Sequence, residues 1–432
     1  MRTPRGERLH IVFTGICNAG KSSLVNAIAG RTLSIVADHP GTTTDPVEKS
    51  MEFSALGPVV LVDTAGLDDA SVLGSLRTAR TNDVLQKADI IIFVTPGNRA
   101  PLQCEQTILQ KLQQREKPII VAVTFSEAPS NKEKVTWLEE YKKLAASQDT
   151  QNKHRAVRGI YYVSNTENTG IESLKRGIAS LADTIEKEIT PLEGLVNEGD
   201  SIMLVTPIDS AAPKGRLILP ETEVLRDALD RNCTVITVQP AQLGAAYANL
   251  MQKPKLVVTD SQAFSYTASV LPLHQALTSF SILFARKKGE LAWFRDGIAM
   301  LDRLNKLNTI NLLAIEACTH NRTHEDIATV KIPAMLHAKT GVPVSVTAIR
   351  SLSDKPPNEF FDIAVICGSC MATRTLFKAQ IAALHEAGIP VVNFGLALAW
   401  GSGLMPRAIE LFPEYSILRE SSYTFINTAQ SV

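Results

Sequence analysis

A G-x-x-x-x-G-K-S motif runs from Gly15 to Ser22 and constrains the fold more than any other feature of the sequence. It lies between a short apolar run, His10–Gly15, and a segment with helical spacing, Lys21–Ala29. Glycines let the backbone curl so that its N–H groups face phosphate oxygens, while a lysine and the helix dipole add positive charge. The motif therefore predicts a phosphate-binding loop in an α/β domain, in which Lys21 neutralises phosphate charge and Ser22 binds Mg²⁺.

Two further elements follow in the order that a P-loop nucleotide hydrolase requires. The apolar run Val59–Val62 ends in Asp63-Thr64-Ala65-Gly66, so Asp63 can hold Mg²⁺ through water and the Gly66 N–H can meet the γ-phosphate. The polar loop Pro40–Pro46 lies before it, and a hydroxyl there, that of Thr43, can complete the Mg²⁺ shell. The order predicts a purine nucleoside triphosphatase whose catalytic residues are Lys21, Thr43, Asp63 and Gly66.

Short apolar runs alternate with longer helical segments, which predicts parallel strands joined by helical crossovers. We expect an α/β protein with an N-terminal P-loop domain, built on a mainly parallel sheet, at residues 1–188. Thr190-Pro191 then breaks the last helix, and two smaller α/β domains are expected at residues 192–262 and 263–432. In the last block, helices are expected at Ile310–Glu316 and Phe361–Cys367. The strands expected in the first domain are His10–Gly15, Val59–Val62, Ile90–Val94, Ile119–Val123 and Gly159–Val163.

The composition argues against attraction to polyanions. Lys+Arg and Asp+Glu number 44 each, so the formal net charge is zero and neither nucleic acid nor an anionic membrane surface is an expected partner. No run is long enough for a membrane span, and no signal peptide is recognisable, so we expect a cytoplasmic protein. The six cysteines are then expected as free thiols or metal ligands rather than as disulfides.

The first domain resembles the translation-factor-related GTPases of the Era and TrmE kind, which implies GTP as the nucleotide. Asn18, together with the Gly-Thr-Thr-Thr loop, is similar to their potassium-dependent subset, where this asparagine helps to hold a K⁺ ion that does the work of an arginine finger. Leu67 follows Gly66 where a catalytic glutamine could stand, which is consistent with a K⁺-assisted mechanism.

The base-reading segment departs from these GTPases, which use Asn-Lys-x-Asp after the fourth strand. This chain has Thr124-Phe125-Ser126-Glu127 there. Glu127 can accept the same two guanine donors but is one methylene longer, so the strictness of guanine specificity stays open. The expected nucleotide-binding residues are Gly15, Asn18, Ala19, Gly20, Lys21, Ser22, Ser23, Thr42, Thr43, Asp63, Gly66 and Glu127.

Three cysteines of the last block form a candidate metal site. Cys367 and Cys370 make a C-x-x-C pair, and Cys318, with His320 two residues later, adds a third thiol. Three thiolates with one open position suit a 4Fe-4S cluster, with His320 as a candidate fourth ligand or hydrogen-bond donor. A C-x-x-C pair is also common in structural zinc and redox sites, so these alternatives stay open.

The three other cysteines have no such companions in the sequence. We expect them to be small buried hydrophobic residues. They are Cys17, Cys104 and Cys233.

A P-loop GTPase followed by a small middle domain and a late cysteine block resembles the HydF family of FeFe-hydrogenase maturation GTPases. The resemblance covers nearly the whole chain, through family-like strings at Arg5–His10, Leu56–Leu61, Asp326–Pro333 and Asn393–Ala397. It implies a GTPase domain, a dimerisation domain and a cluster-binding domain in a homodimer. It also implies a scaffold whose 4Fe-4S cluster helps to carry a diiron precursor from two radical-SAM maturases to apo FeFe-hydrogenase.

One departure from the HydF pattern concerns the cluster. The family usually has histidine directly before the C-x-x-C pair, whereas this chain has Ile366, so the fourth ligand is His320, water, another exogenous group or none. Two rival interpretations remain. One is an Era-like GTPase acting on RNA or ribosomes, with structural zinc or no metal at the cysteines. The other is a redox or scaffold protein whose nucleotide domain has decayed.

Overall fold

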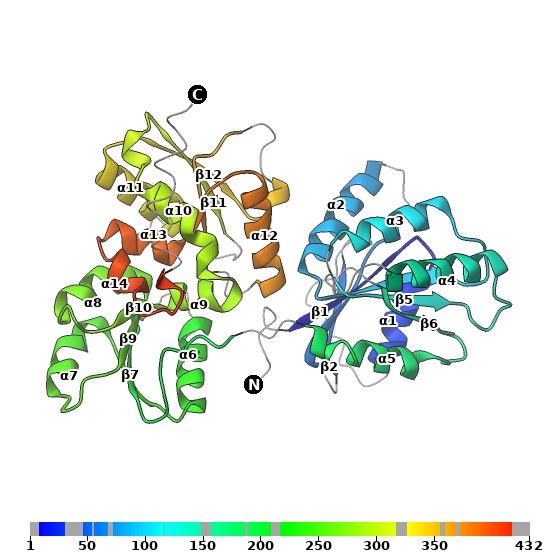
Figure 1. The fold of residues 1–432 in the computed structure, drawn as a ribbon, viewed down its shortest axis with the longest axis horizontal. Helices are drawn as coiled ribbons and strands as arrows, with labels where there is room; N and C mark the ends of the chain where they lie inside the picture. The colour runs from blue at the N-terminus through cyan, green and yellow to red at the C-terminus, as the bar shows by residue number, and fades with distance from the viewer. Residues whose placement is uncertain are drawn as a thin grey trace. The chain divides into compact units, whose positions relative to one another are not determined.

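A computed structural model of the chain describes residues 8–30, 46–53, 56–67, 72–115, 117–147, 157–185, 189–208, 217–316, 326–354, 359–368 and 372–416. The chain forms two compact units, Met1–Lys187 and Glu188–Val432 (Figure 1). Both units are built from α-helices and mainly parallel sheets, so the predicted fold class is confirmed.

The N-terminal unit contains a six-stranded sheet in the order β2-β3-β1-β4-β5-β6. Only the β2–β3 pair is antiparallel. Every residue of β4 and β5 is buried, as expected where helices cover both faces of a parallel sheet. The strands are β1 (Leu9–Gly15), β2 (Val47–Phe53), β3 (Gly57–Asp63), β4 (Ile90–Pro96), β5 (Ile119–Thr124) and β6 (Val157–Tyr162).

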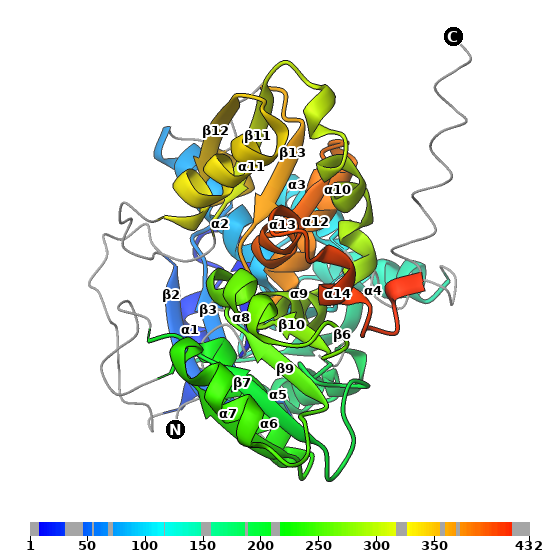
Figure 2. The same ribbon diagram turned by 90° about the vertical axis from the view of Figure 1, so that its left-hand side faces the viewer.

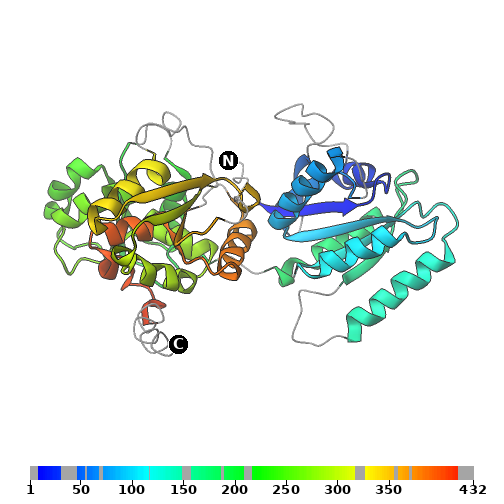
Figure 3. The same ribbon diagram turned by 90° about the horizontal axis from the view of Figure 1, so that it is seen from above.

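Helices lie on both sides of this sheet (Figure 3). The first of them starts where Gly20 adopts a left-handed conformation, φ 85°, and ends before Gly30, φ 70°, two positions that favour glycine. It packs against the last helix of the unit. The helices are α1 (Lys21–Ala29), α2 (Val72–Lys87), α3 (Gln103–Gln113), α4 (Lys132–Ser147) and α5 (Ile171–Ala179).

The C-terminal unit contains two four-stranded parallel sheets, in the orders β10-β9-β7-β8 and β12-β11-β13-β14. Figure 2 shows β11, β12 and β13 side by side and apart from β7 and β9. The strands are β7 (Ser201–Val205), β8 (Thr234–Val238), β9 (Leu256–Thr259), β10 (Leu277–Ser279), β11 (Ile310–Ile315), β12 (Val344–Ile349), β13 (Ile363–Ile366) and β14 (Val391–Asn393).

One hydrophobic core runs through both sheets of this unit, from Leu192 to Phe412. Helix α9 joins them, because it contacts α6 beside the first sheet and both α12 and α13 beside the second. The helices are α6 (Leu219–Asp230), α7 (Leu243–Asn249), α8 (Phe264–Val270), α9 (Phe280–Lys288), α10 (Arg295–Leu301), α11 (Ile332–Thr340), α12 (Arg374–Glu386), α13 (Phe394–Gly401) and α14 (Met405–Ile409).

Two helix predictions are wrong. The segments expected to be helical at Ile310–Glu316 and Phe361–Cys367 contain strands β11 and β13, which pair in parallel with each other. Both strands are almost wholly buried, and apart from Asn311 their residues are apolar and show no alternation. A short apolar run of this kind has the same pattern in a buried strand and in a buried helix, and only its pairing partners decide between them.

None of the helices in the described ranges has the length and apolar character needed to cross a lipid bilayer.

Candidate nucleotide-binding site

The described loops of the N-terminal unit that carry predicted site residues leave the sheet at the carboxyl ends of its parallel strands. Strands β1, β3, β4, β5 and β6 are parallel, so their carboxyl ends point the same way. Ligands of open α/β sheets bind outside the carboxyl ends of the strands. The G-x-x-x-x-G-K-S loop follows β1, and the Asp-Thr-Ala-Gly segment begins at the end of β3. The topology thus gathers motifs that lie far apart in the sequence.

The side chain of Lys21 hydrogen-bonds to the backbone of the P-loop. Lys21 is the first residue of α1, and its side chain is only 7% exposed. Its Nζ donates to the carbonyl oxygen of Ile16 at 2.7 Å and to that of Gly15 at 3.4 Å. Asn18, at the top of the loop, adopts a positive φ of 57° that non-glycine residues seldom adopt. The ammonium group therefore lies against the loop that is predicted to hold phosphate.

Asp63 lies beside the P-loop, and the Ser22 hydroxyl hydrogen-bonds to it. Its Oδ1 atom is buried and has no hydrogen-bond partner among the described residues. Burial raises the pKa of Asp63, whereas the Ser22 hydrogen bond and the positive charges of Lys21 and Lys49 act in the opposite direction. A buried carboxylate oxygen without a donor, next to a serine hydroxyl, fits a hydrated Mg²⁺ ion held by Ser22 and oriented by Asp63.

The Asp-Thr-Ala-Gly segment is fastened to the P-loop. The Leu67 N–H donates to the carbonyl oxygen of Gly15 at 3.2 Å, and the Thr64 hydroxyl donates to that of Phe13 at 2.8 Å. A Cβ added at Gly66 would collide with the Cys17 sulfur and would lie 2.6 Å from the Cys17 nitrogen. Only glycine fits this approach, so Gly66 can bring its N–H close to the P-loop.

Two side chains that sequence reasoning did not assign to the site also bind the P-loop. The buried Thr124 hydroxyl donates to the Ala19 carbonyl oxygen at 2.7 Å, and the Asn165 amide donates to the Gly20 carbonyl oxygen at 3.2 Å. Thr124 ends β5 and Asn165 follows β6. Their positions at or shortly after the carboxyl ends of parallel strands were the available signal, because ligands of open α/β sheets bind at this end of the sheet.

Glu127 is exposed and lies beside the loop that follows β6. The Ser164 hydroxyl hydrogen-bonds to its carboxylate and lowers its pKa, with smaller contributions from a backbone hydrogen bond and the Thr166 hydroxyl. Ser164 also accepts a hydrogen bond from the Glu167 N–H at 3.1 Å. The loop that follows β6 therefore supplies a hydroxyl donor to the Glu127 carboxylate.

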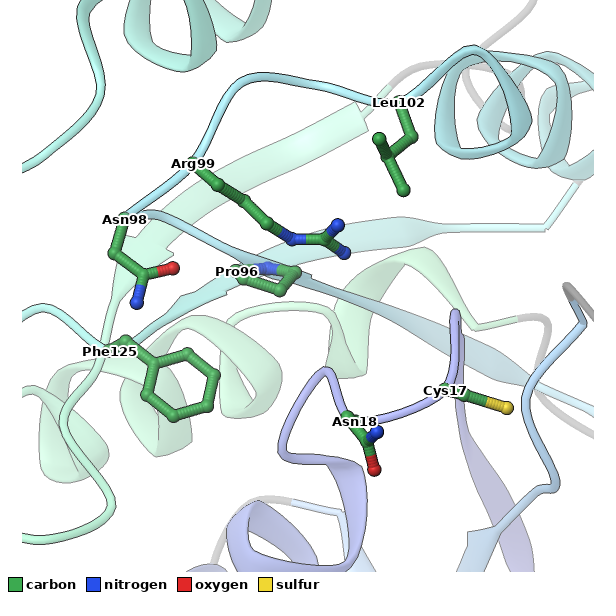
Figure 4. Close-up of a pocket in the computed structure, with 7 residues that line it drawn as sticks. All are labelled: Cys17, Asn18, Pro96, Asn98, Arg99, Leu102 and Phe125. Carbon is green, nitrogen blue, oxygen red and sulfur yellow. The ribbon is translucent and has the colours of Figure 1, made fainter.

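A cavity of about 390 Å³ opens beside the P-loop. Figure 4 shows the Phe125 ring and the Asn18 amide on its walls, with Arg99 reaching in from the loop after β4. Its lining residues are Cys17, Asn18, Pro96, Asn98, Arg99, Leu102 and Phe125.

Several predicted ligands lie outside the described residues. They are Thr42 and Thr43 of the polar loop and Cys318, His320 and Cys370 of the cysteine block. Cys367 is described: it directly follows β13 and is half-buried. Within the described part of the chain, no three His, Cys, Asp or Glu side chains are grouped so that they could hold a metal ion.

The expectation for the remaining cysteines is correct only for Cys233, which is buried. Cys104 is half-buried, and Cys17 is exposed, so the expectation is wrong for Cys17. Cys17 lies in the P-loop and lines the cavity beside it.

Comparison with protein families gives matches in both units of the chain. Residues 10–125 match the model of the 50S ribosome-binding GTPase family. Residues 192–289 match the hydrogen maturase F dimerization domain, and residues 292–411 match the hydrogen maturase F tetramerization domain. The two maturase domains follow each other directly and together span about half of the chain.

The curated relatives include GTPases that match part of the chain. The tRNA modification GTPase MnmE of Endomicrobium trichonymphae is 31% identical over 212 residues, which cover 43% of this chain and 46% of MnmE. GTPase Der of Kosmotoga olearia is 28% identical over 227 residues, which cover 48% of this chain and 50% of Der. The chain thus spans half or less of the length of these relatives.

Solved structures with similarity include Aquifex aeolicus Era bound to GDP and aluminium fluoride, at 18% identity and a TM-score of 0.33 over 61% of this chain and 98% of Era. The G domain of the T. maritima FeoB iron transporter has 24% identity and a TM-score of 0.31 over 41% of this chain and 99% of that domain.

A GTPase domain whose P-loop, Asp63 and Gly66 lie together thus precedes two consecutive domains of a single maturase. The chain belongs to the HydF family of hydrogenase maturases and carries a GTPase domain of the TrmE and Era kind.

Proposed function

We propose that this chain is a GTP-hydrolysing scaffold that holds a 4Fe-4S cluster and helps to deliver the diiron precursor to apo FeFe-hydrogenase. The observation that carries the cluster part is the pairing of Ile315 with Ile366 in neighbouring parallel strands. Cys367 follows Ile366 directly, and Cys318 stands three residues after Ile315. Glu316 and Cys367, the residues that follow this pair, therefore leave neighbouring strands at the same end of the sheet.

The surroundings of Cys367 suit an anionic ligand. The N-terminus of α9 lies close by, since a Cβ at Gly368 would lie 3.4 Å from the Ser281 hydroxyl in the first turn of that helix. The buried Asn393 amide, which caps α13, donates to the Ser281 carbonyl oxygen at 2.9 Å. Two helix N-termini thus meet here, and their partial positive charge favours a thiolate-bound cluster, which carries net negative charge.

When bound, the cluster would supply an iron site with an exchangeable ligand for the cargo. Cys318, Cys367 and Cys370 would hold it. Because Ile366 cannot bind iron, His320, water or another exogenous group would occupy the fourth position.

In the nucleotide site, Lys21 and the P-loop amides would neutralise phosphate charge. Ser22 and Thr43 would hold Mg²⁺, and Asp63 would orient its water. The Asn18 amide lines the cavity beside the P-loop, which supports its role in holding K⁺. The Gly66 N–H would meet the γ-phosphate.

We further propose that the chain works as a homodimer of three-domain protomers, with the GTPase cycle switching its association with partners. The match to a dimerization domain supports self-association. The partners would be the radical-SAM maturases and the apo-hydrogenase.

Metal analysis of anaerobically purified protein tests the proposal. Wild-type protein should contain about four irons and four sulfides per chain and give a 4Fe-4S EPR signal after reduction. Cys367→Ser should lose this signal, whereas Cys104→Ser, which changes a half-buried thiol of the GTPase unit, should retain it. Lys21→Ala should lose GTP turnover and keep its iron. Loss of both in Lys21→Ala would contradict the separation of the two sites.

The rival function is that of an Era-like GTPase acting on RNA or ribosomes. The match of residues 10–125 to a ribosome-binding GTPase model favours it, while the zero net charge opposes it. Zinc or no metal in the purified and reconstituted protein, unchanged by Cys367→Ser, would overturn the cluster proposal and support this rival.

A further inference from the structure

We propose that Phe125 stacks on the purine ring of the bound nucleotide, so that an aromatic face, and only in part the Glu127 carboxylate, holds the base. The inference rests on the proposed nucleotide function and extends it to the way in which this chain recognises the base. It follows from the backbone, the surroundings and the neighbours of Phe125.

The backbone of Phe125 is in an unusual conformation. Its φ is 59°, in the left-handed region, where a bulky aromatic residue is a genuine outlier. The flanking hydrogen bonds fix this conformation: the Ser126 N–H donates to the Val163 carbonyl oxygen at 3.2 Å, and the Ala128 N–H donates to that of Phe125 at 3.1 Å. Strain of this kind persists where the surrounding structure enforces it, and such residues cluster at ligand sites.

The strained backbone directs the ring to the ligand-binding edge of the sheet. Phe125 directly follows Thr124, whose hydroxyl is bonded to the Ala19 carbonyl oxygen in the P-loop. The half-buried ring lines the cavity beside the P-loop and points toward Asn18 (Figure 4). The ring therefore flanks the cavity into which a base can extend from phosphates held by the P-loop.

The opposite wall of the cavity is held rigidly. Gly97, in the loop after β4, donates through its N–H to the Thr124 carbonyl oxygen at 2.9 Å and accepts from the Asn131 N–H at 2.9 Å. Leu102, at the end of this loop, donates to the buried Glu105 carboxylate at 2.8 Å. A preorganised wall lets a flat ligand bind beside Phe125 without ordering this loop first.

Glu127 is poorly suited to discriminate between bases alone. The Ser164 hydroxyl, which also lies 3.0 Å from that of Thr166, hydrogen-bonds to its carboxylate, so a base has to share the carboxylate with this donor. Sites dedicated to hydrogen bonding reject analogues that lack the donor by about 10⁴-fold or more. Stacking does not distinguish one purine face from another. We therefore expect this chain to prefer guanine over adenine by less than about 10⁴-fold.

Binding of ribose-labelled GDP and ADP to the full chain, with Mg²⁺ and K⁺ present, tests the proposal. Phe125→Ala should weaken both nucleotides by a similar factor, roughly 5- to 150-fold, the range measured for loss of one base–aromatic stack. Phe125→Tyr, which keeps the aromatic face, should bind like the wild type. Glu127→Gln should weaken GDP and leave ADP unchanged.

A second readout covers the case in which Phe125→Ala fails to fold. In Phe125→Trp, the introduced indole should be quenched by GDP and by ADP, and the wild-type affinities should be retained. A folded Phe125→Ala protein that binds both nucleotides within twofold of the wild type, or a Phe125→Trp protein whose indole fluorescence does not respond to nucleotide, would overturn the role of Phe125. If instead the wild type binds neither nucleotide, or Lys21→Ala binds as tightly as the wild type, the nucleotide function itself fails.

Discussion

The hydroxyl of Thr124 donates a buried 2.7 Å hydrogen bond to the carbonyl oxygen of Ala19, across 105 positions of sequence. The same hydroxyl lies 3.3 Å from the Thr95 carbonyl oxygen at the end of β4. One side chain therefore ties the base-side loop, the P-loop and a neighbouring strand together. This contact explains how a chain without the usual Asn-Lys-x-Asp segment keeps its P-loop attached to the sheet.

Thr124→Val should lower the free energy of unfolding of the GTPase unit by about 1–3 kcal/mol, because a buried carbonyl oxygen loses its donor while the side-chain shape is kept. Trp137 is the only tryptophan before residue 188, so urea unfolding followed by tryptophan fluorescence measures this unit selectively once Trp293 and Trp400 are replaced by phenylalanine in every protein compared. Thr124→Ser, which retains the hydroxyl, is the matched control and should stay closer to the wild type. Equal stability of the valine variant and the wild type would contradict the role of this bond.

Asp63→Asn should make the ligand-free protein more stable and its Mg²⁺–nucleotide complex weaker. Burial raises the pKa of Asp63 in the folded protein above its ordinary value. Its stabilising contribution is therefore fully present below the unfolded pKa and is lost as the pH rises through the raised folded pKa. The melting temperature of the variant minus that of the wild type should accordingly increase across this acidic window.

With Mg²⁺ and nucleotide bound, the wild type should melt at a higher temperature than Asp63→Asn, which reverses the order expected without ligand. With Mg²⁺ and GDP present, the variant should bind the nucleotide about 10- to 100-fold more weakly, the usual effect of losing a group that orients a metal ligand. Calorimetric melting with and without Mg²⁺–GDP checks both parts. A variant that melts below the wild type without ligand would refute the argument from burial.

Gly66→Ala should abolish GTP turnover while the protein stays folded. The new methyl group would collide with the Cys17 sulfur and approach the Cys17 nitrogen to 2.6 Å and its Cα to 2.8 Å. Adding Cys17→Ala removes the sulfur but not these backbone contacts, so the double variant should remain inactive. Phosphate-release assays on both proteins test this. Recovery of GTP turnover in the double variant would show that only the Cys17 side chain, and not its backbone, clashes with a methyl group at position 66.

Replacing one partner of the buried ion pair between Lys134 and Glu105 should lower the free energy of unfolding strongly. Their Nζ and Oε2 atoms lie 2.9 Å apart, the side chains are 1% and 0% exposed, and Thr95 bonds to both. Glu105→Gln should reduce the stability of the GTPase unit by about 3–5 kcal/mol, because a buried ammonium loses its counter-charge. Replacing both, as Glu105→Leu with Lys134→Met, should destabilise less than the single change when Trp137 unfolding curves are compared.

Sequence patterns predicted the GTPase unit well. The expected strands at His10–Gly15 and Ile119–Val123 match β1 and β5 to within one residue at each end, because β-rich apolar runs there are bounded by glycine, proline or charged residues. The helix expected at Lys21–Ala29 has the same bounds as α1. Strand β2 was not expected, since most of its side chains are polar and exposed at the sheet edge.

The C-terminal unit was harder to predict. Its strands β11 and β13 have buried apolar sequences that a helix could share, and only their pairing with each other identifies them. In the candidate site, motif residues such as Lys21 and Asp63 could be predicted because their spacing is fixed by phosphate geometry. Contacts such as that of Asn165 with Gly20 could not, because they depend on which loops the folded sheet brings together.

The pairing of Ile315 with Ile366 also implies that the sheet folds before a metal centre is inserted. Helix α11 and strand β12 lie between these two residues in the sequence. The two residues therefore come together only when β11 and β13 have paired in the sheet. A metal centre drawing ligands from the segments that follow them would then be inserted into a finished domain. Unlike a zinc finger, which is unfolded without its metal, such a protein would fold empty and be loaded, discharged and reloaded without unfolding.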